Sequence, residues 1–143
     1  MSANRILQPE GWAQPKGYVN GVEAEGRVVF VAGQIGWNPE TCAFETDDFV
    51  GQVEQALRNV LAVLAAGGAG PQHLARMTWY VTDRAAYVAN TRAIGRVWRE
   101  SFGREFPAMT LVVVAGLLEE RAKVEIEATA VVPHLRETES PTA

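Results

Sequence analysis

The sequence has little of several residue types on which common kinds of site depend. Cys42 is the only cysteine among 143 residues, so no disulfide can form within the chain, and a lone thiol suits a reducing compartment. His73 and His134 are the only histidines. The sequence also lacks a glycine-rich phosphate loop, a serine elbow and a helical pair of histidines that would bind zinc. We therefore expect no metal site and no bound cofactor.

Basic residues and long apolar runs are also scarce. Thirteen Lys and Arg stand against seventeen Asp and Glu, which gives a net charge of -4. Because nucleic-acid-binding proteins draw most of their affinity from basic surfaces, this balance argues against a nucleic-acid partner. The longest run of apolar residues and glycine, Leu111 to Leu118, is too short to span a bilayer, and residues 1–17 contain no signal-peptide pattern. We expect a cytoplasmic protein with no membrane partner.

What the sequence does contain is typical of one globular domain. Apolar residues make up 48% and charged residues 21%, both near the globular average. Prolines and glycines in residues 1–17 indicate an irregular N-terminal arm. Residues 18–132 are expected to form a single domain. Residues 133–143 are polar, contain two prolines and are expected to form a flexible tail.

Apolar residues at helical spacing predict two helices. In the first helix, the residues that recur on one face run from Val50 to Leu64. In the second, a similar stripe runs from Tyr87 to Phe102. The expected start and stop residues are Thr46 or Asp47 with Gly67-Gly68 for the first helix, and Asp83 with Gly103 for the second.

Five strands are expected around these helices. Residues 18–24 and 27–33 read as a hairpin joined at Glu25-Gly26, and residues 73–82, 108–115 and 121–132 read as three further strands. The order of elements predicts an α+β domain, in which two helices cover one face of the sheet. Because Val28–Ala32 and Met109–Val114 are apolar on both faces, the second face needs another cover. A second copy of the chain is the simplest one, so we expect a homo-oligomer.

Two groups of residues could carry chemistry. Glu125 and Glu127 share one face of the last strand, where they are either solvated, paired with Lys123 or Arg121, or engaged with a ligand. Among the aromatic residues, Tyr18, Trp37, Trp79 and Tyr80 could build a pocket, with core or interface packing as the alternative, and Trp98 belongs by spacing to the core.

Several segments resemble one known family. Val28–Ile35 (VVFVAGQI), Met77–Asp83, Phe106–Ala108 and Val124–Ala128 (VEIEA) resemble the Rid/YjgF family, whose members are also called endoribonuclease L-PSP proteins. The resemblance extends over residues 18–132. It implies a chorismate-mutase-like α+β fold, a mixed sheet with two helices on one face. It also implies a homotrimer built around a central barrel, with clefts between subunits that hold small ligands.

The resemblance also implies an activity and a set of site residues. Well-known members hydrolyse reactive enamines and imines to keto acids and ammonia. Glu125 matches the glutamate that helps to position the attacking water, so it is the expected catalytic residue. Tyr18, Gly33 and Asn90 match other pocket positions and are expected to contact the ligand.

Three positions depart from the family pattern. Met109 stands where an arginine would grip the carboxylate of the substrate, Leu111 replaces a cysteine, and Ala32 replaces a serine. Loss of a charge-assisted hydrogen bond costs roughly 1.5–3 kcal/mol, so a small 2-iminocarboxylate is a poorer fit than a more apolar or aromatic ligand at Met109 and Leu111.

Two functions therefore remain open at the level of sequence. One is a divergent hydrolase that deaminates a small imine or enamine, with Glu125 acting on water. The other is a non-catalytic trimer that binds a small ligand, in a regulatory role for example, in the same cleft. A ribonuclease is disfavoured by the negative charge, the two histidines and the absence of a basic cluster.

Overall fold

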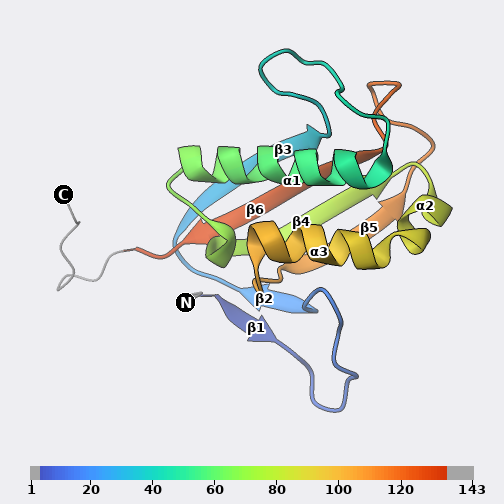
Figure 1. The fold of residues 1–143 in the computed structure, drawn as a ribbon. Coiled ribbons are helices and arrows are strands. Elements are labelled where there is room, and N and C mark those ends of the chain that lie inside the picture. The colour runs from blue at the N-terminus through green and yellow to red at the C-terminus, as the bar shows by residue number, and fades with distance from the viewer. Residues whose placement is uncertain (1–3, 135–143) are drawn as a thin grey trace.

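A four-stranded mixed sheet forms the centre of the computed structural model, which describes residues 4–134 (Figure 1). Its order is β3 (Arg27–Ile35), β6 (Val124–Val132), β4 (Leu74–Val81) and β5 (Ala108–Val113). β6 is antiparallel to both of its neighbours, β3 and β4, whereas β4 and β5 run parallel. The expected α+β class is confirmed.

Two long helices lie side by side on one face of this sheet (Figure 1). The first, α1 (Phe49–Ala66), begins one residue later than expected: the side chain of Asp48 accepts a hydrogen bond from the Gly51 amide at 2.9 Å. Asp47, an expected cap, instead forms an ion pair with Arg121. The predicted second helix is broken at Asn90 into α2 (Arg84–Ala89) and α3 (Thr91–Phe102).

The expected ends of the second helical segment are correct. The carboxylate of Asp83 accepts hydrogen bonds from two amides at the start of α2. Gly103 ends α3 with φ 63°, a value that glycine adopts without strain. A single turn of 3-10 helix, η1 (Pro71–His73), precedes β4.

The predicted hairpin is wrong. β2 (Gly21–Glu23) pairs with β1 (Arg5–Leu7), and β3 pairs with β6 instead of β2. The arm that was expected to be irregular therefore contains a strand, β1, and this strand is the partner of β2. Just after the arm, Val19 forms a parallel bridge with Ala108 on β5, at the free edge of the sheet.

The hydrophobic core lies between the helices and the sheet. The strict alternation predicted for β6 is confirmed, because Val124, Ile126 and Ala130 are fully buried under the helices. The largest side chains with almost no exposed surface are those of Trp79, Leu57, Leu64, Met77, Ile126 and Gln52. The core therefore holds the tryptophan that the sequence left open between core and pocket.

The other face of the sheet carries no helix within residues 4–134, and we refer to it as the open face. Phe30 on β3 is 78% exposed there, and the side chains of Val28 and Val112 are also exposed. The strands expected to be apolar on both faces thus expose apolar side chains on the open face. The predicted tail lies almost entirely outside the described residues.

Candidate functional site

Glu125 and Gly33, two residues predicted to share a site, lie against each other on the open face. The register between β3 and β6 shifts between Val31 and Gln34, which places one extra residue on β3 at this point. A Cβ atom at position 33 would stand 2.9 Å from Glu125 Cδ and 3.0 Å from Cγ, and closer still to Oε1. Glycine at this position therefore allows the carboxylate to rest on the backbone of β3.

The two glutamates of β6 differ in their partners. The hydroxyl of Tyr80 donates a hydrogen bond to Glu127 Oε1 at 2.8 Å, and this bond raises the pKa of Tyr80 above its usual value. Within residues 4–134, no hydrogen bond or ion pair engages the carboxylate of Glu125. Because an ionised carboxylate accepts hydrogen bonds, Glu125 is the one that can hold a water or a polar ligand group.

Met109 and Leu111 lie on the opposite face of the sheet from Glu125. On β5 they stand in register with Met77 and Trp79, which face the helices, and both pack against the core. Since successive side chains of a strand alternate between faces, these residues and Glu125 are separated by the sheet within one copy. A single chain therefore does not bring the predicted ligand contacts and the predicted catalytic residue together.

The two remaining predicted residues lie on the helix and arm side. Asn90 joins α2 to α3, and its Nδ2 donates a hydrogen bond to the carbonyl of Ala86 at 2.7 Å. Tyr18 is exposed and precedes Val19, whose amide donates to the carbonyl of Pro107 at the start of β5. No hydrogen bond joins either residue to Glu125 in the described part of the chain.

The aromatic pocket suggested by the sequence does not form from those four residues. Trp37 packs against Phe44 in the loop before α1, with ring centroids 6.0 Å apart. Tyr80 lies on the open face with Glu127. Trp79 lines a cavity, together with residues of α3, the segment after it and the N-terminal arm.

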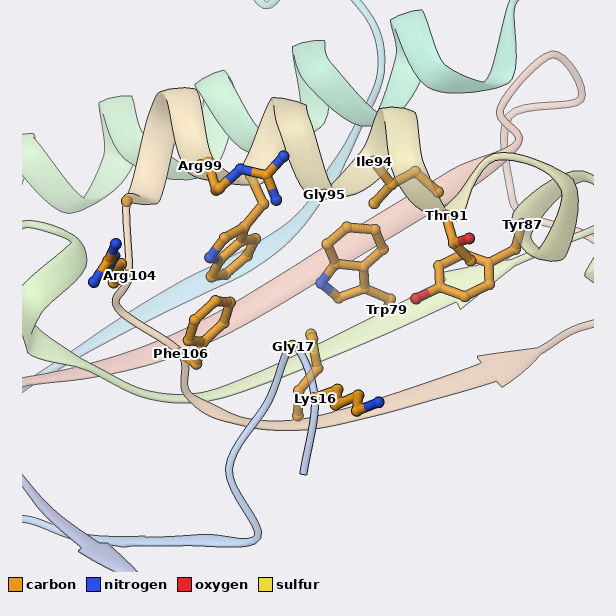
Figure 2. A pocket seen from close by; sticks show the side chains of 13 residues that line it. Lys16, Gly17, Trp79, Tyr87, Thr91, Ile94, Gly95, Arg99, Arg104 and Phe106 are labelled. Carbon is orange, nitrogen blue, oxygen red and sulfur yellow. The ribbon is translucent and has the colours of Figure 1, made fainter. Parts of the chain in front are cut away.

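This cavity, of about 550 Å³, lies between α3, the start of β5 and the N-terminal arm (Figure 2). Its floor is aromatic: the rings of Trp79 and Trp98 are 6.5 Å apart, and Phe106 stacks on Trp98 at 5.9 Å. Lys16, Arg99 and Arg104 also line it. Sequence reasoning missed this site because its residues are far apart along the chain. The one signal was the number of aromatic residues near the second helix.

Neither the cavity nor the open face offers an evident metal site. No group of three or more histidine, cysteine, aspartate or glutamate side chains able to hold a metal ion occurs among the described residues. Tyr87, which lines the cavity, has its pKa raised by burial, so its hydroxyl remains neutral at physiological pH. No helix between residues 4 and 134 is long and apolar enough to cross a membrane.

Comparisons with known proteins agree with this architecture. The sequence profile described as Endoribonuclease L-PSP matches residues 12–132. A 2-iminobutanoate/2-iminopropanoate deaminase from Dermatophagoides farinae is 32% identical over 132 residues, which cover 92% of this chain and 99% of that protein. The crystal structure of YyfB from Yersinia pestis, a Rid-family protein of unknown function, has a TM-score of 0.80 at 30% identity. The match covers 90% of this chain and 98% of that one.

A second solved structure adds a ligand to the comparison. TdcF from Escherichia coli, determined with bound serine, has a TM-score of 0.63 at 30% identity and covers 90% of this chain and 98% of that one. The residues matched by the family profile, 12–132, include β3, with Gly33, and β6, with Glu125. Fold and sequence therefore agree, and the chain belongs to the Rid/YjgF family, whose sequence profile is described as endoribonuclease L-PSP.

Proposed function

We propose that this chain hydrolyses a small imine or enamine to a carbonyl compound and ammonia, with Glu125 as the residue that activates water. Relatives named 2-iminobutanoate/2-iminopropanoate deaminase support imine hydrolysis at the level of the family. The observation that carries the proposal for this chain is the free carboxylate of Glu125, which rests on Gly33 and has no protein partner among the described residues. The carboxylate of the neighbouring Glu127 accepts a hydrogen bond from Tyr80 and is therefore less available to a water or a ligand.

The reaction requires two protons to be moved from oxygen to nitrogen. As the oxygen of a bound water attacks the imine carbon, Glu125 accepts a proton from that water and passes it to the nitrogen, which gives a carbinolamine. Glu125 then accepts the hydroxyl proton of the carbinolamine and delivers it to the same nitrogen. The C–N bond breaks, and ammonia leaves as the carbonyl forms. A positioned general base of this kind contributes about 10²–10⁴-fold to a rate.

A complete site needs a second copy of the chain. Met109 and Leu111 lie on the helix-covered face, while Glu125 lies on the open face, so one subunit presents only one half of the predicted set. The uncovered apolar side chains of Val28 and Phe30 give a reason for copies to associate. We propose a cytoplasmic homotrimer in which the open face of one subunit completes the ligand site of its neighbour.

The methionine at position 109 makes this a divergent member in our proposal. Without an arginine there, a small 2-imino acid loses a charge-assisted hydrogen bond worth roughly 1.5–3 kcal/mol. We therefore expect slow hydrolysis of the imines formed during serine or threonine breakdown. A larger or more apolar imine should be hydrolysed faster.

The test is ammonia release from a panel of imines generated in place, comparing Glu125→Gln with Glu127→Gln. The first change removes the proposed base with little change of shape and should lower turnover by about 10²-fold or more. The second removes an equal charge two residues away on the same face and should change turnover only severalfold. Native mass measurements on both variants serve as the control for assembly. Undiminished turnover of assembled Glu125→Gln would show that the proposed mechanism is wrong.

A non-catalytic ligand-binding or regulatory trimer is the second candidate function, and Met109 is the observation that favours it. In that case ligands bind without any release of ammonia, and Glu125→Gln changes binding instead of turnover. RNA cleavage is a weaker candidate despite the description of the family, because the net charge of -4 and the two histidines offer little to hold or cut a phosphodiester.

A further inference from the structure

The cavity beneath α3 has unsatisfied hydrogen-bond donors in its floor. Trp79 is 2% exposed and Trp98 is 5% exposed, and both line the cavity. The indole Nε1 of each is buried and has no hydrogen-bond partner in the described structure. Because a buried N–H without an acceptor costs free energy, an acceptor that gains access to these groups as a ligand enters would relieve that cost.

The rim of the same cavity is positively charged. Arg99 on α3 and Arg104 just after it stand near one end, and Lys16 comes from the arm (Figure 2). No acidic residue lines the cavity, and none of the three cations forms an ion pair within residues 4–134. Arginine side chains in this state bind carboxylates well, because the guanidinium can donate two parallel hydrogen bonds.

The walls between the floor and the rim are apolar. Ile94, Phe106 and Met109 contribute them, and about 550 Å³ of space lies within. Ligand sites for organic molecules usually measure about 300–1,000 Å³ and combine apolar walls with a few polar groups. A small imino acid would leave most of this space empty, whereas a molecule with an aromatic ring would occupy more of it.

We propose that this cavity is a binding site for an aromatic carboxylate. The ring lies against Trp79, Trp98 and Phe106, and the carboxylate is held by Arg99 and Arg104 in place of an arginine at position 109. Carboxylate or keto oxygens of the ligand accept hydrogen bonds from the buried indole N–H groups. The cavity shares Met109 with the ligand site proposed above and rests on that proposal for its place in the reaction, but binding itself requires no hydrolysis by Glu125 and is tested without it.

The indole N–H signals of the four tryptophans provide the test. In ¹⁵N–¹H spectra of the full chain, the signals of Trp12 and Trp37 are identified by their loss in Trp12→Phe and Trp37→Phe, and the remaining pair belongs to the cavity. Titration with 3-phenylpropanoate should shift that pair and leave the other two in place. Propanoate lacks the ring and 3-phenylpropan-1-ol lacks the charge, so each should bind about tenfold more weakly or worse.

Exposed arginines allow a matched set of variants. Arg99→Gln and Arg104→Gln should each weaken 3-phenylpropanoate binding about tenfold, since each removes a charge-assisted hydrogen bond. Arg96→Gln, on the same helix but outside the cavity lining, should leave binding unchanged.

Three results would overturn the assignment. The first is equal binding of the alcohol and the acid, which would show that Arg99 and Arg104 do not hold the carboxylate. The second is a shift of the Trp12 or Trp37 signals instead of the cavity pair. The third is the absence of any shift at millimolar 3-phenylpropanoate in a folded sample.

Discussion

Gly33 on β3 forms the surface on which the Glu125 side chain of β6 rests. Any β-carbon at position 33 would lie 2.9 Å from Glu125 Cδ, inside normal contact distance. The orientation of the free carboxylate therefore depends on the absence of one carbon atom from the neighbouring strand. A substitution at position 33 can therefore displace the carboxylate of Glu125 while the glutamate itself is unchanged.

Gly33→Ala should lower turnover while leaving the fold intact. The new methyl group displaces the end of the Glu125 side chain, which can rotate into the open face. The free energy of unfolding should change by no more than about 1 kcal/mol, because alanine loses less backbone entropy than glycine. Ammonia release and urea unfolding measure the two effects. Gly116→Ala, where the added carbon meets no atom within 4 Å, is the control.

Phe30→Asp should separate the proposed trimer into monomers. Phe30 is 78% exposed on the open face, so a charge there costs a single subunit little, whereas it would be buried between copies in an assembly. Light scattering after size exclusion gives the mass. Leu118→Asp, at a residue 99% exposed in the loop before β6, should keep the mass of the unsubstituted protein. An unchanged mass for Phe30→Asp would contradict the proposed interface.

Gln52→Leu should destabilise the chain by about 3 kcal/mol. The buried amide of Gln52 on α1 donates to the carbonyls of Thr46 and Arg121 at 3.1 and 3.0 Å and accepts from the Lys123 amide at 2.8 Å. Leucine leaves these backbone groups without their partner, whereas Gln55→Leu on the same helix removes only a bond to Asn59. Urea denaturation of the two variants should separate them clearly, and equal losses would contradict this prediction.

Acid should weaken the fold through His73. Burial, followed by the charge of Arg27, lowers the pKa of His73, and its Nδ1 accepts a hydrogen bond from the Gly70 amide at 3.0 Å, which requires a neutral ring. As the pH falls through about 6.5, the unfolded chain takes up a proton that the folded chain resists, so stability declines.

Urea denaturation at pH 7.5 and 5.5, at one protein concentration, measures this decline. The decline should shrink in His73→Gln. It should persist in His134→Gln, because His134 is exposed near the end of the described chain. An equal decline in both variants would assign the acid sensitivity to other groups.

Local patterns predicted the elements better than their partners. The alternation in β6 correctly placed Ile126 in the core and Glu125 on the other face. Successive side chains of a strand point to opposite faces, so an apolar residue at every second position indicates which face is buried. The turn at Glu25-Gly26 suggested a hairpin, yet β3 pairs with a strand about a hundred residues away. Pairing over such distances is decided by which long strands match in the folded sheet, and no local signal reports it.

The same limit applied to the candidate site. The family resemblance grouped Gly33 with Glu125, and the structure places the two residues next to each other. Met109 and Leu111 lie on a strand that is apolar on both sides, so alternation could not tell which face they occupy. The sequence did not predict the cavity, because Lys16, Trp79 and Arg104 are far apart along the chain and come together only in the folded protein.

The order of strands in the sheet has a consequence for how the chain is made. β6 is the last of the described strands along the chain, yet it lies between β3 and β4, which are hydrogen-bonded to it and not to each other. A ribosome releases β3 and β4 first, and neither can complete its pairing until residues 124–132 emerge. The sheet therefore closes only after nearly all of the described chain has been synthesised, and until then the apolar strands depend on α1 or on chaperones for cover.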